Sequence, residues 1–334
     1  MGVSFEIGLL PQGPVAELVE LAVAAEELGF RGVWVADSQS VFRDAYAALA
    51  LCAARTSKVR LATGVTNPVT RHPAVLAGSI ATLDELSGGR ATLGIGLGES
   101  SVRTLGLRPA RLKELEEATQ VIRSLLRGDT ATHQGKEIRM AWPTRPVPIF
   151  FAASGPKSLQ LAGRIADGVL FQVGSDPALV NYALKNIRLG AEQAGRKLSN
   201  IRLYARLACA VAADGRRARE EVRGYAAAAA GTVFTSVPKQ DMPAGLWAEI
   251  KKMKEQYDYY QHASSAAAHK ELVTDRILDS IAIAGTPEEA LPKFKAMVTL
   301  GVEGFVLPLS TTQPKELLRT LAEKIIPHFG SGSV

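Results

Sequence analysis

The stretch VRLATGVTNPVTRHP, residues 59–73, contains the pattern on which the fold prediction rests. Its first residues form a short apolar run typical of a buried strand, and the amphipathic segment at 74–86 is typical of a helix. An ordinary strand-to-helix turn needs only one glycine and one capping residue. This junction adds hydroxyls, an amide, an arginine, a histidine and two prolines, and this excess of polar groups suggests that it holds something other than protein.

The same unit of apolar strand, turn and amphipathic helix recurs along the chain. Strands are predicted at residues 3–10, 32–36, 59–66, 91–96, 148–152, 168–173, 201–211 and 304–309. Eight such units are the number in a closed parallel barrel, whereas an open doubly wound sheet usually has fewer strands. The sequence therefore predicts an α/β fold, a (β/α)8 TIM barrel that forms a single domain over residues 1–330.

Three segments depart from this alternation. Residues 130–140 contain Gly135 between two short polar runs, which predicts an inserted hairpin. Residues 226–281 are helical and mixed, with the aromatic group YDYY in their middle, and predict a helical insertion between the seventh and eighth strands. A lid, a subunit contact and a surface excursion are all open explanations of this insertion. The tail, residues 331–334, is predicted to be disordered.

The composition limits the classes of partner. The formal net charge is +6, but the basic residues are dispersed, so we expect a solvated surface or an anionic cofactor rather than nucleic acid or a membrane. The sequence shows neither a secretory signal pattern nor an apolar run of the ~20 residues that a membrane span needs. Cys52 and Cys209 lie far apart in apolar surroundings, which favours free thiols in a reducing cytoplasm and no metal site.

In a barrel of this type the active site lies where the strands end at their C-termini. There GIGLGE, residues 94–99, combines glycines that allow close backbone approach with Glu99, which can accept hydrogen bonds or move a proton. A crowded strand end that needs small residues is the alternative explanation. The segment AASGPK, residues 152–157, stands at a helix N-terminus, where free amides, Ser154 and Lys157 would cradle a phosphate. Simple capping by Ser154 is the alternative there.

Two further carboxylates are candidates for a catalytic role. Asp37 follows the second strand and could bond a substrate or cofactor, or could instead cap the next segment. Glu6 lies in the first strand among apolar neighbours, on the same face as Gly8 because side chains alternate along a strand. A buried Glu6 would be a fair general acid, unless it pairs with an interior arginine or lies near the bottom rim. His72 is interpreted as a packed or capping residue.

Four segments together resemble one family. They are TGVTNPVTRHP at 63–73, GIGLGE at 94–99, AASGP at 152–156 and IAGTPEE at 283–289. In this order and spacing they resemble the bacterial-luciferase-like superfamily of flavin-dependent oxidoreductases. Within it the chain looks most similar to the branch that uses the deazaflavin coenzyme F420, particularly methylenetetrahydromethanopterin reductase. The resemblance implies a TIM barrel with an insertion near the seventh strand and a deazaflavin ring across the barrel mouth.

The resemblance also assigns roles to residues. It implies a non-prolyl cis peptide bond between Gly64 and Val65 that supports the back face of the ring, with Thr66 and Asn67 bonding the pyrimidine edge. It places the cofactor phosphate near Ser154. The positions expected to bind cofactor are Ser38, Gly64, Val65, Thr66, Asn67, Gly98, Ala153, Ser154, Gly155, Gln172 and Val173. Relatives of this kind commonly form homodimers, so we expect a homodimer.

Two positions depart from the family pattern. Many F420-dependent dehydrogenases carry Asp-His after the second strand, where this chain has Asp37-Ser38. The reductases have a glutamate near the end of the first strand, where this chain has Gly8, and Glu6 lies two residues deeper. We therefore expect an F420-dependent oxidoreductase that moves a hydride between deazaflavin and a small organic substrate, at a C=N or activated C=C bond rather than an alcohol.

In that reaction Glu99, Asp37 or Glu6 would handle the proton. Three alternatives stay open at this stage. The first is an FMN-dependent luciferase-like monooxygenase, and the second is a reductase that takes its hydride directly from NAD(P)H. The third is a barrel that binds a ligand without turnover.

Overall fold

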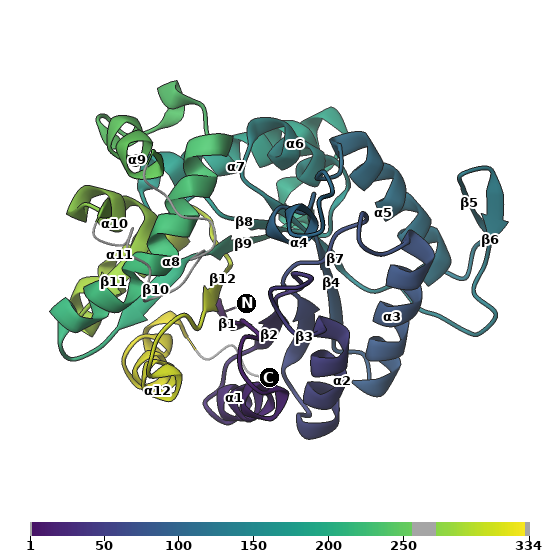
Figure 1. Ribbon diagram of the computed structural model, residues 1–334, viewed down its shortest axis with the longest axis horizontal. Helices are drawn as coiled ribbons and strands as arrows, with labels where there is room; N and C mark the ends of the chain where they lie inside the picture. The colour runs from purple at the N-terminus through teal and green to yellow at the C-terminus, as the bar shows by residue number, and fades with distance from the viewer. Residues whose placement is uncertain (1, 256–271, 331–334) are drawn as a thin grey trace.

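The computed structural model describes residues 2–255 and 272–330. Eight parallel strands close into a barrel in the order β1-β12-β9-β8-β7-β4-β3-β2 (Figure 1). Their bounds are β1 Ser4–Leu9, β2 Gly32–Val35, β3 Arg60–Thr63, β4 Ala91–Ile95, β7 Ile149–Ala153, β8 Gly168–Phe171, β9 Arg202–Arg206 and β12 Gly304–Pro308. The predicted TIM-barrel fold is confirmed.

Helices surround the barrel because each presents an apolar face to the outward side of the strands. They are α1 Val15–Glu27, α2 Ala45–Arg55, α3 Pro73–Leu86, α5 Leu112–Leu126, α6 Pro156–Ile165, α7 Pro177–Gln193, α11 Pro287–Thr299 and α12 Pro314–Lys324. Shorter helical turns are α4 Ser100–Arg103, η1 Leu198–Asn200 and η5 Ile326–Phe329. The outer core between strands and helices contains residues such as Ile7, Val33 and Leu61, all fully buried.

A second, smaller cluster fills the inside of the barrel. It consists of Trp34, Ala62, Phe150, Leu170, Tyr204 and Val306, with Val65 packed against it. Because side chains alternate along each strand, the inward-facing residues of β9 are Arg202, Tyr204 and Arg206. The two clusters therefore identify which side of each strand faces the barrel axis, and this decides which side chains can reach the mouth.

The chain leaves the barrel after β9. The single strand predicted at 201–211 is wrong in this respect, because β9 ends at Arg206 and the next residues form a separate strand, β10 (Ala208–Val211). The Leu207 amide still donates to the Val306 carbonyl of β12, but β10 then pairs in parallel with β11 (Ala282–Gly285) outside the barrel. The same apolar pattern thus serves two different sheets.

The insertion is larger than predicted and contains this second sheet. It adds α8 (Gly215–Ser236), η2 (Lys239–Asp241), α9 (Leu246–Lys254) and α10 (Asp275–Ile281) on one side of the barrel (Figure 1). The predicted aromatic group at 257–260 and the tail at 331–334 lie outside the described residues. The insertion therefore starts at the end of β9, well before residue 226.

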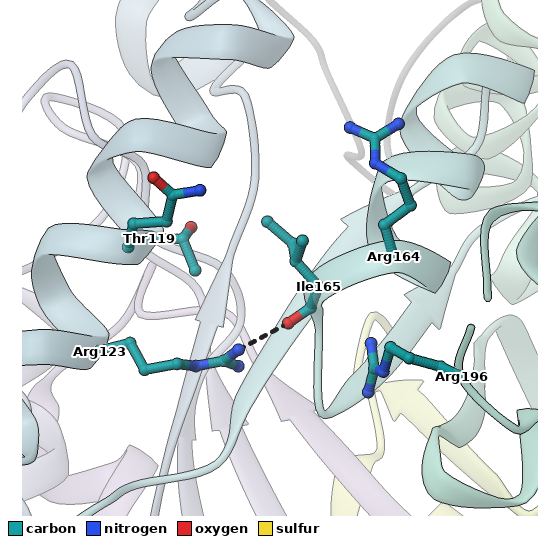
Figure 2. Close-up of a pocket in the computed structure, with 6 residues that line it drawn as sticks. Thr119, Arg123, Arg164, Ile165 and Arg196 are labelled. Carbon is teal, nitrogen blue, oxygen red and sulfur yellow. Dashed lines mark hydrogen bonds between the residues drawn. The ribbon is translucent and has the colours of Figure 1, made fainter. Parts of the chain in front are cut away.

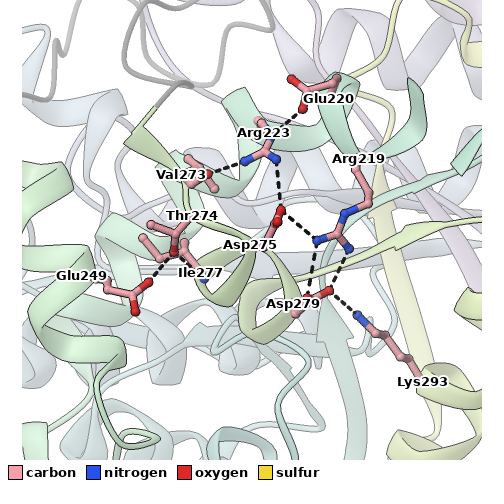
Figure 3. A network of polar contacts seen from close by, with 10 residues as sticks. All are labelled: Arg219, Glu220, Arg223, Glu249, Val273, Thr274, Asp275, Ile277, Asp279 and Lys293. Carbon is pink, nitrogen blue, oxygen red and sulfur yellow. Dashed lines mark hydrogen bonds and ion pairs between the residues drawn. The ribbon is translucent and has the colours of Figure 1, made fainter. Parts of the chain in front are cut away.

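Ion pairs fix the insertion to the rest of the chain. Figure 3 shows Arg219 of α8 reaching both Asp275 and Asp279 of α10, at 3.0 and 2.8 Å. Arg223 pairs with Asp275 at 3.1 Å, and Lys293 of α11 pairs with Asp279 at 3.0 Å. This network of charges joins three helices, so α8 and α10 are held together at the side of the barrel.

Two smaller predictions are also decided by the structure. The hairpin is confirmed, with β5 (Ala131–His133) and β6 (Lys136–Ile138) antiparallel and projecting on the side opposite the insertion (Figure 1). Cys52 and Cys209 are buried free thiols, and burial raises the pKa of each to about 12, so neither is a reactive thiolate. Within the described ranges, no helix is both long and apolar enough to cross a membrane.

Candidate functional site

Most polar residues of the 63–73 stretch bond to protein. The Thr63 hydroxyl exchanges two hydrogen bonds with the backbone of Gly94, and the His72 ring accepts from the Ala74 amide and caps α3. The Asn67 side-chain oxygen accepts from the Thr70 amide, and its nitrogen donates to Ser101. These contacts explain the polar excess at this junction largely as loop anchoring, and the His72 interpretation as a capping residue is confirmed.

A buried ion pair between Asp37 and Arg71 anchors the same loop. Asp37, only 5% exposed, accepts from Arg71, Thr66 and Gln39. Burial alone would lower the pKa of Arg71, but hydrogen bonds from it to Asp37 and Asp44 raise that pKa above its ordinary value. The carboxylate of Asp37 therefore has its own cation and is committed to holding the loop.

The Gly64–Val65 segment lies between these anchors. The peptide bond joining the two residues is cis. The Val65 side chain packs on the inner cluster and is partly exposed, while Thr66 and Asn67 are fully buried. The side chains of Thr66 and Asn67 are occupied by protein partners, so the structure gives them a loop-holding role instead of the ring contacts that the resemblance assigned to them.

The loop after β4 closes over the loop after β2. Ser38 and Ser100 share a hydrogen bond of 2.7 Å between their hydroxyls. Gly98 has a positive φ of 81°, and a Cβ there would lie 2.8 Å from Val102, so both conformation and space require glycine at this position. Ser38 and Gly98, both expected to bind cofactor, thus belong to two loops that meet at the barrel mouth.

The three predicted catalytic carboxylates have different surroundings. Glu99 is the most open, with a side chain 71% exposed and paired with Arg103 of α4, the short helix that follows it. Glu6 is 1% exposed and accepts from Trp34, Ser4 and Arg60. Of Glu99, Asp37 and Glu6, only Glu99 has a carboxylate that is open to the solvent.

Glu6 lies far from the barrel mouth. The strand register places it beside Gly32, the first residue of β2, and Gly32 lies beside Arg60, the first residue of β3. It therefore belongs to the N-terminal half of the barrel, below the indole ring of Trp34. The catalytic role suggested for Glu6 is not supported by this position, and the interior pairing with an arginine explains the residue.

Barrel strand β7 is followed by helix α6, whose N-terminus has no side-chain cap. Gly155 is the N-cap residue of α6 and no side chain caps this N-terminus, while the Ser154 hydroxyl donates to the Gln172 carbonyl at 2.9 Å. Ser154, Gly155 and Gln172 are partly exposed. Simple capping by Ser154 is therefore wrong, and the free amides at the start of α6 suit an anion.

Two of the predicted cofactor contacts point elsewhere. Ala153 and Val173 are 6% and 0% exposed and belong to the outer core between strands and helices. Alternation along β7 turns Ala153 outward when Ala152 and Ser154 face the barrel axis. The side chains of Ala153 and Val173 are thus unavailable to a molecule in the mouth, although their backbones lie at the strand ends.

Arg206 stands at a strand end, where the barrel rule places the active site, but the sequence assigned it no role. It is the last residue of β9, partly exposed and facing the barrel axis. Its guanidinium donates to the Gly64 carbonyl at 3.0 Å and to the Tyr225 hydroxyl of α8 at 3.1 Å. Two arginines, Arg202 and Arg206, in a mostly apolar strand were the available signal, but the partner of Arg206, 142 residues away, could not be read from the sequence.

A pocket of about 360 Å³ lies at the other end of the barrel (Figure 2). Arg123 donates to the Ile165 carbonyl, and Arg196 donates to the carbonyls of Gly163 and Ala166. These are the last carbonyls of α6, so the arginines of this pocket cap a helix C-terminus. Asp167, paired with Arg123, directly precedes β8, which places the pocket at the N-terminal ends of the strands.

The fold and the loops together define an α/β-barrel protein. At the C-terminal ends of its strands lie an exposed carboxylate, the uncapped start of a helix and glycine-rich turns. The chain belongs to the luciferase-like monooxygenase family, whose profile matches residues 3–304. It is 32% identical to 5,10-methylenetetrahydromethanopterin reductase of Methanolobus tindarius, over 97% of this chain and 99% of the relative. It is also 32% identical to F420-dependent glucose-6-phosphate dehydrogenase of Nakamurella multipartita, over 95% and 93%.

Solved structures agree with this assignment. The chain is similar to the coenzyme F420 dependent tetrahydromethanopterin reductase from Methanopyrus kandleri, with a TM-score of 0.82 and 25% identity over 99% of this chain and all of that one. A monooxygenase from Streptomyces bottropensis matches with a TM-score of 0.70 and 24% identity over 98% of this chain and all of that one. The similarity to the Streptomyces monooxygenase shows a common fold alone. The resemblance to the luciferase-like superfamily that the motifs predicted is confirmed.

Proposed function

We propose that this protein is an F420-dependent oxidoreductase that moves a hydride between the deazaflavin and a small organic substrate. The observation that supports it most is the uncapped start of α6, which stands at the same barrel end as the Gly64–Val65 segment and Glu99. Free amides there fit a phosphate group, and relatives of nearly the same length depend on F420 according to their names.

The residues of the mouth would divide the work as follows. The amides of α6 and the Ser154 backbone would hold the cofactor phosphate, and the Gly64–Val65 segment would lie against one face of the ring. The bound deazaflavin supplies the hydride chemistry, and the protein supplies orientation. Glu99 is the proposed proton-handling group because its carboxylate, although paired with Arg103, is open to the mouth, whereas Asp37 and Glu6 are buried in their pairs with Arg71 and Arg60.

The proposed substrate class depends on position 38, where this chain has a serine and no histidine. Ser38 offers a hydroxyl, already bonded to Ser100, where an alcohol dehydrogenase of this kind would use an imidazole base. A serine hydroxyl cannot serve as a general base near neutral pH without an activating partner. We therefore propose reduction of a C=N or activated C=C bond, with Glu99 donating the proton.

Titration of the purified protein with F420, FMN and NADH tests this proposal. F420 binding is followed by its fluorescence, and the proposal expects saturable binding of F420 and hydride transfer from its reduced form to a panel of imines and activated alkenes. An FMN-dependent monooxygenase would instead bind FMN and consume O2 with the reduced flavin. Reaction with NADH alone, or binding without any turnover, would favour the two remaining alternatives.

We further propose a cytoplasmic homodimer. Leu51 of α2 and Val75 of α3 are 52% exposed, and Leu86 is 57% exposed, on two helices that contact each other. Exposed apolar side chains on two neighbouring helices fit a subunit contact. Light scattering after size-exclusion chromatography would give the mass, and a Leu51→Glu variant should shift a dimer of 35.5 kDa chains to the monomer.

A further inference from the structure

Arg206 reaches across the barrel. It stands on β9, and its Nη1 donates to the carbonyl of Gly64, which follows β3, at 3.0 Å. In the closed strand order, β8, β7 and β4 separate these two strands on one side, and β12, β1 and β2 separate them on the other. The two strands are therefore opposite walls, and the Arg206 side chain spans the inside of the barrel just below its mouth.

The same guanidinium also contacts the insertion. Its Nε donates to the Tyr225 hydroxyl at 3.1 Å, and Tyr225 is a buried residue of α8, 6% exposed. A guanidinium presents its N–H groups in a rigid planar fork, so it can hold two acceptors in fixed directions at once. Arg206 thus joins three parts of the chain: the end of β9, the Gly64 carbonyl and helix α8.

The partners of Arg206 differ from those of other arginines at this end of the barrel. Arg71 neutralises Asp37 and Arg103 neutralises Glu99. Within residues 2–255 and 272–330, Arg206 has no ion pair, and both of its partners are uncharged oxygens. Its contact with Gly64 therefore does not neutralise a charge, and its effect is to fix where that carbonyl lies.

We propose that Arg206 is a positioning residue that holds the Gly64–Val65 segment from across the barrel, and that Tyr225 ties this contact to the insertion. The holding contact stands on the structure alone. Its consequence for a bound ring rests on the proposed function, because the Gly64–Val65 segment is the surface against which the deazaflavin would lie. A shift of about 1 Å in such a surface is enough to lower binding and turnover markedly.

Hydrogen exchange of the ligand-free protein tests the holding contact directly. The amides of Gly64 and Thr66 donate to the carbonyls of Val35 and Gly94 and should exchange slowly. In Arg206→Gln we expect peptides covering residues 60–70 to exchange about tenfold faster, because this segment opens locally. The matched control is Arg196→Gln, which removes a half-buried arginine with two carbonyl partners at the other end of the barrel.

Two milder variants keep the test valid if Arg206→Gln does not fold. Arg206→Lys can bond one partner but not both, and Tyr225→Phe removes only the bond to α8. Both should give a smaller increase in exchange at residues 60–70. Exchange at this segment as slow as in the wild type, in any folded variant that lacks the Gly64 contact, would overturn the proposal.

F420 affinity then tests the consequence for the ligand. We expect Arg206→Gln to raise the Kd for F420 about tenfold and Arg196→Gln to leave it unchanged. A wild-type protein that fails to bind F420 contradicts the proposed function, and the exchange experiment still decides the role of Arg206. An unchanged Kd in a variant with fast exchange at residues 60–70 would contradict the positioning role toward the cofactor.

Discussion

Replacement of Arg71 by methionine should destabilise the protein through the buried carboxylate that it leaves behind. Removing one partner of a buried ion pair costs about 3–5 kcal/mol. The Arg71 side chain is 21% exposed, and Asp37 keeps its bonds from Gln39 and Thr66, so part of that cost is avoided. We therefore expect Arg71→Met to lower the free energy of unfolding by about 2–3 kcal/mol.

Equilibrium urea unfolding, followed by tryptophan fluorescence, measures this change. Arg103→Met is the matched control, because Arg103 pairs with Glu99 at the same barrel end but both side chains are more than half exposed, at 61% and 71%. An exposed pair contributes under about 1 kcal/mol, so the control should hardly move the midpoint. Equal effects of the two substitutions would mean that no buried ion pair anchors the polar 63–73 stretch.

Three further predictions follow from the site and the insertion. Glu99→Gln should lower kcat about a hundredfold while the Kd for F420 is unchanged, as stopped-flow and fluorescence titration would show. Ser154→Asp should raise the Kd for F420 about tenfold by repelling the phosphate, whereas the neutral Ser154→Asn should not. The pKa of Asp275 is lowered by its hydrogen bond to Arg219; burial would raise the pKa of Asp279, but Arg219 and Lys293 lower it. When ionised, at a pH above their ordinary pKa, both carboxylates stabilise the insertion. This stabilisation is lost as the pH falls through their lowered pKa values in the folded protein. Amide hydrogen exchange in α10 should therefore become faster below about pH 4, before the barrel itself opens.

The barrel could be predicted from the sequence because each strand is a compact apolar run followed by an amphipathic helix. The strand at 201–211 shows the limit of this signal. Its apolar alternation continues through Leu207, and nothing local distinguishes the part that pairs with β12 from the part that pairs with β11. Strand β11, with only AIAG as its sequence, has too little pattern of its own to be recognised.

The sequence selects positions at the ends of the barrel strands, but it does not give the contacts of the side chains there. In such barrels the active site lies at the C-terminal ends of the strands, and this rule selected the loops that contain Ser38, Gly98 and Ser154. Which side chains are free depends on partners distant in sequence, such as Arg60 for Glu6 and Arg71 for Asp37. Spacing along the chain holds no information on these pairings, so it could not separate a buried, paired carboxylate from an open one.

The cofactor of the wild-type protein is decided by fluorescence titration with F420, with FMN titrated in parallel. We expect saturable binding of F420, weakened in Ser154→Asp, and weaker binding of FMN. Absence of F420 binding by folded protein, together with tight binding of FMN, would contradict this expectation.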